Sequence, residues 1–528
     1  MIRDSLFSAA LLSALALSGG AAAQTLTVGV RAGPLSIDPH FTASAVSAEA
    51  LKHVFDTVVK SGDDLQLERG LAESWKAIDA TTWEFKFRKG VKFHDGSDFT
   101  AEDVKFSIER IPKVTGPNPA TIYVRRVKEA TVVDPLTLRV TTDGPAPTLP
   151  NDFIRLFVVS SKVAKDVSTK ETANEAFNSG KAAVGTGPYK FVSWTPKEEM
   201  VVARNDGYWG EKQPWEKVIR KELPNDATRV AQLKAGQVDI ISRTPAADVP
   251  QLEKDPKLAV VKADSVYLFY LEFDFREKTP QVTARDGSAL PENPFRNPKV
   301  REAIDLAIDR EALAEIAMEG MGKPVSQLVT PNIFGYDPSI VVPKPDPKKA
   351  KALLAEAGYP NGFKVVFNHT NDGLPGDRAV GASVAQMIAA TGIDIQANAQ
   401  PGAVWAPARQ RGDFSLWMAG WGTLTGEANY TLSSLIHTND AAKKMGAFNV
   451  RGYSNAEADK LIQGAAGEMD EARRKDLLQQ AARLVARERP DLPLVGIVTA
   501  WTMRKDKVTI TPRADEDTLA MNIKPVGK

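Results

Sequence analysis

The sequence predicts an α/β protein built from two or three domains. Its 528 residues are 43% hydrophobic, which is enough apolar material for more than one core. Short apolar strands alternate with amphipathic helices along the whole chain. No segment repeats at a period of about 20 to 50 residues, which disfavours a solenoid or a propeller.

The strands are predicted from short apolar runs and from alternation. In the segment 83–88, Trp83, Phe85 and Phe87 alternate with charged residues, which is the period of a half-buried strand. The other strand predictions are 25–30, 137–141, 258–261, 266–273, 363–367 and 393–397.

Helices are predicted where apolar residues recur at helical spacing behind a capping residue. Thr100 with Asp103 three positions later predicts a capping box. Asn297 followed by Pro298 predicts the start of a helix over 298–317. Two more helices are predicted over 348–357, ending at Gly358, and over 470–489, ending before a proline.

The N-terminus has the pattern of a secretory signal peptide. Arg3 precedes an apolar stretch over 6–17 and three alanines at 21–23, so cleavage is expected after Ala23. The stretch is too short to span a bilayer, which needs about 20 residues. The chain has no cysteine, so we expect no disulfide and no lipidated anchor. These features together predict a protein that diffuses in a periplasm, without membrane insertion.

Charge and motifs disfavour several classes of function. Lysine and arginine number 67 against 66 aspartate and glutamate, a net charge of +1, which argues against a nucleic-acid partner. GxGxxG, GxxxxGK[ST], HExxH and GxSxG are all absent from the sequence. We therefore expect no nucleotide, no cofactor, no metal held by protein ligands and no catalysis. The five histidines are scattered: His40, His53, His94, His369 and His437.

Several blocks of sequence resemble one known family. The run LAESWKAIDATTWEFKFRKGVKFHDGSDFTAEDVKFSIER at 71–110 resembles the signature of family 5 solute-binding proteins, and further similar blocks follow in order at 185–189, 204–210, 229–240, 297–304 and 356–360. Members of this family are extracytoplasmic receptors that deliver peptides, nickel chelates and related solutes to ABC importers. The resemblance covers essentially the whole mature chain.

The resemblance implies a type II periplasmic binding protein fold, with two hinge-connected lobes and an extra subdomain in lobe one. Lobe one is expected over 24–60, 184–278 and the C-terminal tail 489–528. The inserted subdomain is expected over 61–183, and lobe two over 279–488. It also implies a monomer whose partners are a small solute and the permease subunits of an importer.

The resemblance places part of the solute site in the loop after Trp421, which includes Thr423. Peptide-binding members carry an aspartate there that pairs with the peptide ammonium, but this chain has Leu424, which cannot accept a charge-assisted hydrogen bond. Glu427 is the nearest carboxylate. The triplet 425–427 is similar to the branch containing the glutathione-binding receptor, and glutathione carries its ammonium on a γ-linked group, displaced from the usual position. A solvated carboxylate or a helix-start charge remains the alternative for Glu427.

Other candidates come from loops that reach the cleft in the family. Arg378 lies near the position of an arginine that grips the ligand carboxylate, which alignment gives to Leu374 or Pro375. Pairing with the neighbouring aspartate or a helix-start role is the alternative for Arg378. Arg31, after the first strand, is a candidate partner for a ligand carboxylate.

Trp405 and Trp421 are candidates to flank an apolar group of the solute. Arg409 and Arg411 lie in a helical setting nearby, where the default interpretation is a solvated face.

The leading hypothesis is a periplasmic receptor that closes two lobes over a short peptide or glutathione-like peptide. A receptor for a non-peptide solute, such as a metal chelate, an opine or a sugar derivative, remains open because the aspartate is missing. A periplasmic chaperone or sensory adaptor, and an enzyme, are the alternatives from other classes.

Overall fold

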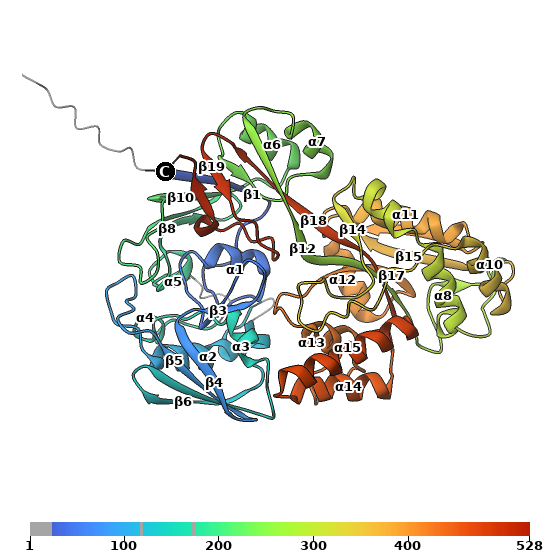
Figure 1. The fold of residues 1–528 in the computed structure, drawn as a ribbon, viewed down its shortest axis with the longest axis horizontal. Helices are drawn as coiled ribbons and strands as arrows, with labels where there is room; N and C mark the ends of the chain where they lie inside the picture. Colours follow the sequence, from blue (N-terminus) through green and yellow to red (C-terminus); the bar gives the residue numbers. More distant parts are fainter. Residues whose placement is uncertain (1–23, 117–119, 171–174, 528) are drawn as a thin grey trace, which may run out of the picture.

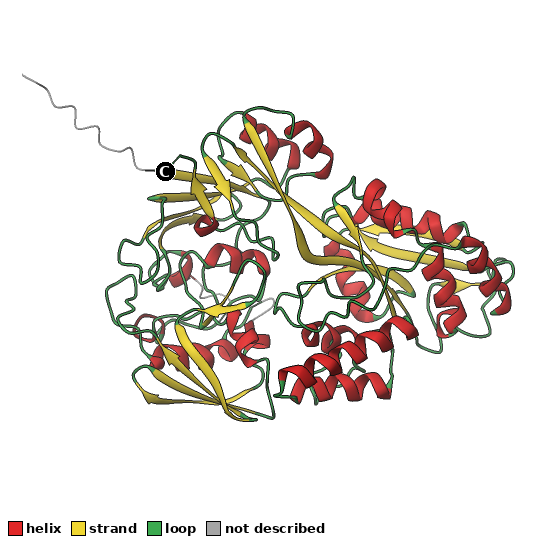
Figure 2. Ribbon diagram, viewed as in Figure 1, coloured by secondary structure: helices red, strands yellow, loops and turns green. Residues whose placement is uncertain are grey.

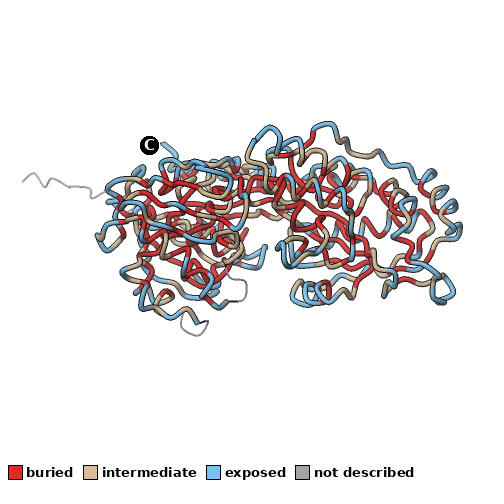
Figure 3. Tube along the Cα trace, turned by 90° about the horizontal axis from the view of Figure 1, so that it is seen from below, coloured by how far each residue is buried: buried red, intermediate tan, exposed pale blue. Residues whose placement is uncertain are grey.

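The computed structural model describes residues 24–116, 120–170 and 175–527 (Figure 1). The predicted signal peptide, residues 1–23, lies outside the described residues. The first and last parts of the described chain share one lobe, and the middle of the chain forms the other. Strands and helices are mixed in both lobes (Figure 2), and buried backbone runs through each of them (Figure 3). The predicted two-lobed α/β fold is confirmed.

Two long antiparallel strands pass between the lobes. They are β12 (Leu258–Phe273) and β18 (Asp491–Arg504), paired from Leu258 opposite Arg504 to Glu272 opposite Asp491. The sequence predicts two strands, 258–261 and 266–273, where the structure has one. The ladder shifts register between Asp264 and Leu268 but resumes against the same partner, so the strand continues through a bulge.

One large sheet extends through both lobes by way of these strands. Its order is β13-β15-β17-β12-β18-β11-β1-β10-β9-β8, with β14 paired to β18 and β16 paired to β15. The lobe-one strands are β1 (Thr25–Val30), β8 (Tyr189–Thr195), β9 (Glu199–Arg204), β10 (Lys217–Glu222) and β11 (Ile240–Ile241). The lobe-two strands are β13 (Val282–Thr283), β14 (Gly322–Pro324), β15 (Lys364–Thr370), β16 (Asp394–Gln400) and β17 (Leu416–Gly422).

A second sheet forms a separate layer in lobe one, with the order β4-β5-β7-β6. Strand β5 (Thr82–Phe87) follows the predicted alternation except at Glu84, which is buried and pairs with Arg139. The predicted capping box opens α2 (Ala101–Arg110), where the Thr100 amide donates to Asp103 at 2.9 Å.

The other strands of this sheet are β4 (Ala72–Asp79), β6 (Val127–Asp134) and β7 (Thr137–Thr142), and the short helices α3 (Leu149–Asp152), α4 (Ser161–Ala164) and α5 (Glu175–Asn178) follow it along the chain. Also in lobe one are β2 (Val59–Ser61), β3 (Leu67–Arg69), α1 (Ala45–Leu51), α6 (Asp226–Lys234), α7 (Val249–Leu252), β19 (Val508–Ile510) and β20 (Ile523–Pro525). The exact boundaries of the inserted subdomain stay a prediction.

Two helices of lobe two begin at aspartate side chains that cap them. Asp346 accepts from the Lys349 amide, and Asp470 accepts from the Arg473 amide. These caps open α10 (Pro347–Glu356) and α15 (Glu471–Glu488), within one residue of the predicted starts. The other helices are α8 (Pro298–Ala307), α9 (Arg310–Ala312), α11 (Asp377–Ala389), α12 (Gly402–Arg411), α13 (Ala428–Thr431) and α14 (Ala456–Gly467).

The single helix predicted over 298–317 is wrong. Helix α8 stops before Ile308, whose φ of −91° and ψ of 115° are extended. Asp309 then caps a second start by accepting from the Ala312 amide at 3.0 Å. The apolar spacing continues across this break, which is why the pattern alone predicted one helix.

A buried charge cluster holds the lobe-two end of the crossing strands. Glu272 of β12 contacts the guanidinium groups of Arg409 and Arg451, and it accepts from the Trp417 indole. Arg451 also contacts Asp491 of β18 at 2.7 Å. Glu272 and Arg451 are each 0% exposed, so each charge is stabilised by the other and not by water. Arg409 therefore does not lie on a solvated face as predicted, whereas Arg411 is exposed.

Arg451→Met should destabilise the protein by about 3–5 kcal/mol, because it leaves Glu272 and Asp491 buried without their shared cation. Urea unfolding followed by tryptophan fluorescence measures this loss. Arg411→Met is the matched control, since Arg411 forms an exposed pair with Asp413, and its effect should stay within about 0.5 kcal/mol. Equal stability of the two variants would contradict the role of the cluster.

Candidate functional site

A cavity of about 560 Å³ opens between the two lobes beside the crossing strand β18. Lobe one contributes Arg31, Asp226 and the segment 243–247, and lobe two contributes residues within the segments 317–321 and 371–379 together with Ala382. Residues 497–500 of the crossing strand β18 form one wall of the cavity. A space of this size accommodates a ligand of a few hundred daltons.

Arg31 and Arg378 reach this cavity from opposite lobes. Arg31 follows β1, and Arg378 is the second residue of α11. Among the described residues neither side chain has an ion-pair partner. The Asp377 carboxylate is engaged by the Thr370 hydroxyl at 2.7 Å and the Gly373 amide at 2.8 Å, so it does not pair with the Arg378 guanidinium. Leu374 and Pro375 line the same cavity.

A third arginine in the cavity already has a partner. The Nε atom of Arg243 lies 2.8 Å from the carboxylate of Glu516, which is 3% exposed. Burial, and next the negative charge of Glu516, raise the pKa of the Tyr267 phenol beside them. No sequence pattern predicts this pair, because the two residues are far apart in the chain. The only local signals are the position of Arg243 just after β11 and the acidic run 515–517.

The loop after β17 is tied down within lobe two. The Trp421 indole donates to the Thr431 hydroxyl at 2.9 Å, and the Thr423 hydroxyl contacts the same oxygen at 2.8 Å. Trp421 also stacks on Tyr430, with ring centroids 5.3 Å apart. Thr423 is fully buried, and Leu424 packs half-buried against the lobe-two core. Of the predicted site residues in this loop, Trp421 and Leu424 keep some exposed surface.

Trp405 lies in the hydrophobic core of lobe two, where it packs on Phe414. Its side chain is 8% exposed, which leaves little surface for a solute. The structure therefore brings Arg31 and Arg378 to one cavity and places Trp405 in the core.

Glu427 is buried rather than solvated. It is 3% exposed, and its carboxylate lies 3.2 Å from the Nε atom of Arg474, in a geometry that makes an ion pair without a hydrogen bond. Burial raises the pKa of Glu427 to about 7, although the charge of Arg474 opposes the shift. Because Arg474 already faces the Glu427 carboxylate, this carboxylate is a weaker anchor for an ammonium group than a free aspartate would be.

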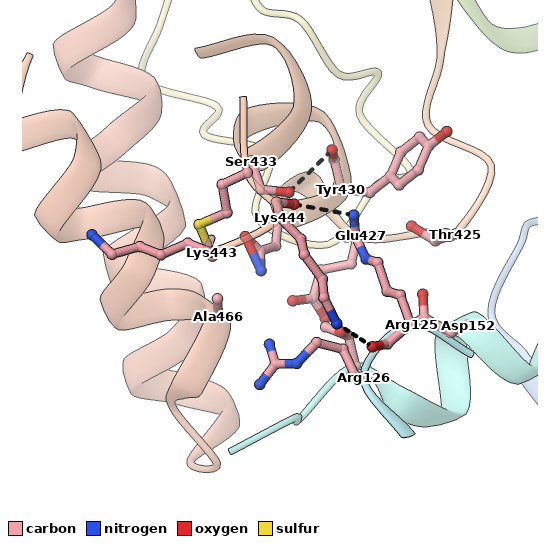
Figure 4. Close-up of a pocket in the computed structure, with 13 residues that line it drawn as sticks. Arg125, Arg126, Asp152, Thr425, Glu427, Tyr430, Ser433, Lys443, Lys444 and Ala466 are labelled. Atoms are coloured by element: carbon pink, nitrogen blue, oxygen red, sulfur yellow. Dashed lines mark hydrogen bonds between the residues drawn. The ribbon is translucent and has the colours of Figure 1, made fainter. Parts of the chain in front are cut away.

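Glu427 lines a pocket of about 50 Å³ between the lobes (Figure 4). Asp152, at the end of α3 in lobe one, lines the same pocket. Burial raises the pKa of Asp152 to about 7. The charges of Arg125 and Arg126 oppose this shift, and the nearby Glu427 carboxylate adds to it.

The lobes touch around this pocket. The Arg125 guanidinium donates to the Lys444 carbonyl at 3.3 Å, and the Lys444 ammonium donates to the Arg125 carbonyl at 2.7 Å. The Asn151 amide donates to the Thr425 carbonyl at 2.8 Å. The described structure is therefore a form in which the two lobes are in contact across the cleft.

Within residues 24–116, 120–170 and 175–527, no three metal-ligating side chains come together, and no helix is long and apolar enough to cross a membrane.

Asp152→Asn should stabilise the protein at pH 8 and leave it unchanged at pH 4. The folded pKa of about 7 lies above the ordinary value of 3.8, so stability from this carboxyl is lost as pH rises between these values. Thermal unfolding across this range measures the effect.

The control for this experiment is Glu356→Gln. A hydrogen bond from Lys299 lowers the pKa of Glu356, so its removal should not stabilise the protein at pH 8. A parallel response of the Asp152 and Glu356 variants would contradict the assignment.

Comparison with known proteins agrees with this architecture. The family model described as bacterial extracellular solute-binding proteins, family 5 Middle, matches residues 66–443. The glutathione-binding protein GsiB of Shigella boydii is 27% identical over 500 residues, covering 93% of this chain and 93% of the relative. Heme-binding protein A of Haemophilus influenzae is 30% identical over 494 residues, covering 88% of this chain and 86% of the relative.

A solved structure matches over nearly the full length. It is the ABC transporter-associated periplasmic binding protein DppA of Helicobacter pylori, in complex with the peptide STSA. The TM-score is 0.76 at 25% identity, and the match covers 95% of this chain and 98% of that chain. This chain belongs to family 5 of the bacterial extracellular solute-binding proteins.

Proposed function

We propose that this protein is the periplasmic receptor for a small solute with two acidic groups, which it delivers to an ABC importer. The observation that supports this proposal best is the pair Arg31 and Arg378, which line one interlobe cavity from opposite lobes. A guanidinium matches a carboxylate bidentately. A solute that engages both arginines favours the closed arrangement, because each lobe holds one end of it.

A glutathione-like peptide fits this arrangement. Glutathione has two carboxylates, and its ammonium sits on a γ-linked glutamyl group. Leu424 removes the usual ammonium anchor, and Glu427 is the nearest carboxylate in that loop, although Arg474 already pairs with it. The relative GsiB is named as a glutathione-binding protein, which is consistent with this class of solute.

The second candidate is a non-peptide acid, such as an opine or a metal chelate. The substitution of Leu424 for the anchoring aspartate favours it, because an opine or chelate need not present a free peptide ammonium. One relative is named heme-binding protein A. Heme has two propionate groups, which also suit a pair of arginines. Both candidates use the same cavity and differ in what occupies its centre.

We place the receptor in the periplasm, exported by the signal peptide 1–23 and released without a lipid anchor because the chain has no cysteine. It acts as a monomer that presents its closed form to the permease. The importer supplies the energy for transport, so we assign this chain no nucleotide, no cofactor and no catalytic step.

Native mass spectrometry of protein purified from a periplasmic extract should detect a bound solute of a few hundred daltons. The mass difference before and after denaturation and refolding identifies its class. A thiol tripeptide supports the glutathione-like proposal, and a non-peptide acid supports the second candidate. A bound solute without acidic groups would contradict the role of both arginines.

Arg378→Leu should weaken binding of the co-purified solute about 10- to 100-fold, since it removes a charge-assisted contact. Isothermal titration of the refolded protein with that solute measures the change. Arg411→Leu is the control, because Arg411 lies on the exposed end of α12 and outside the cavity lining. If the two variants bind alike, Arg378 is not a solute contact.

A further inference from the structure

One leucine of lobe one is buried in lobe two. Leu65 lies in the turn 62–66 between β2 and β3, with acidic and polar neighbours on both sides. It is nevertheless 2% exposed. It belongs to the hydrophobic cluster of lobe two, which includes Leu328, Val329, Ile333, Ala428 and Leu432. The burial of this side chain therefore depends on the contact between the lobes.

The turn presents Leu65 in an unusual backbone conformation. Its φ of 68° is in the left-handed region, which a leucine rarely adopts. The turn is closed by the Gly62 amide, which donates to the Gln66 carbonyl at 2.8 Å, and by the Leu65 amide, which donates to the Gly62 carbonyl at 3.1 Å. A strained residue persists where the surroundings determine its conformation.

Lobe one holds this turn rigidly through Asp63. The Asp63 carboxylate accepts from Arg513 at 3.0 Å and from Asn522 at 2.8 Å, and its carbonyl accepts from the Ala514 amide at 2.8 Å. All three donors come from the C-terminal tail of lobe one. Leu65 is therefore presented to lobe two by a fixed support rather than by a loose loop.

The receiving surface in lobe two is the loop that carries Glu427. Gly426 has a φ of 74°, and a Cβ atom there would lie 2.7 Å from the Leu65 carbonyl oxygen and 3.8 Å from its Cβ. Glycine at 426 thus allows the turn to approach the loop at van der Waals distance. The same loop is fixed on its other side, since the Phe334 amide donates to the Gly426 carbonyl at 3.0 Å.

We propose that Leu65 is a positioning residue for closure, which enters lobe two only in the closed form and sets the loop 423–427 in place. This inference rests on the proposed receptor function. Apolar surface that is buried in the closed state alone stabilises that state over the open one. The polar contacts between Arg125 and Lys444 are exposed and contribute less, because water and salt compete with them.

The test uses the absence of native cysteines to attach two spin labels. Lys128→Cys in lobe one and Lys475→Cys in lobe two replace exposed residues on opposite lobes. Pulsed electron paramagnetic resonance then gives the distribution of distances between the two labels. It is recorded on the protein as purified and again after the solute has been removed by refolding. The wild-type background should show a short-distance closed population in at least one of these samples.

In that sample Leu65→Ala should lower the ratio of closed to open protein about tenfold or more. Leu65→Met, which nearly conserves volume, should restore most of the closed population. Leu67→Ala is the matched control, because Leu67 lies on the same hairpin but packs against the core of lobe one, and it should leave the ratio unchanged.

The proposal is overturned if Leu65→Ala keeps the wild-type distribution, or if Leu67→Ala shifts it equally. A wild type without a closed population in either sample would also overturn it, since the contact would then not form in solution. Equal solute binding by Arg378→Leu and Arg411→Leu would contradict the proposed solute site instead, because the distance measurement does not depend on the identity of a solute.

Discussion

The two lobes are joined by a single antiparallel ladder. The chain crosses between the lobes once in β12 and once in β18, and these strands pair with each other through the crossing. Every change in the angle between the lobes must therefore be accommodated in this ladder. The ladder already shifts register between Asp264 and Leu268 and again between Phe269 and Tyr270, so a bend at these points disturbs less regular pairing than a bend elsewhere. Residues 497–500 of β18 also line the interlobe cavity, which brings such a bend next to the proposed solute site.

The lobe-two end of the same ladder is held by charge. Glu272 and Asp491 lie opposite each other in register, where two neighbouring carboxylates would repel. Arg451 contacts both of them, and Arg409 contacts Glu272 from α12. Burial raises the pKa of Asp491 to about 7, and the guanidinium of Arg451 opposes this shift. This end of the ladder is thus fixed to lobe two, which leaves the bulge as the more compliant part.

Local signals in the sequence predicted the elements that local interactions determine. Asp470 caps α15, and Thr100 with Asp103 opens α2, because a cap needs only residues within one turn. The interpretation of Arg409 was wrong because its partner Glu272 is 137 residues away. The break at Ile308 was missed because apolar spacing persists through it, although Asp309 was a visible second cap.

Some residues of the candidate site could also be predicted from the sequence, and others could not. The resemblance to family 5 predicted Arg31 and Arg378, which line one cavity, but the cation–carboxylate pair Arg243 and Glu516 has no local pattern. Leu65 had the opposite signal, since a single leucine in a polar turn predicts exposure. Its burial arises only because a second lobe covers it.

In the proposed function, selection of the solute and closure of the two lobes depend on different residues. Under this proposal, charged groups in the cavity discriminate among solutes, because an unmatched buried charge is costly. An apolar contact such as that of Leu65 with the lobe-two core is the same whichever solute is bound. A receptor arranged in this way can change its solute by substitutions around Arg31 and Arg378 while the contacts that close the lobes stay intact.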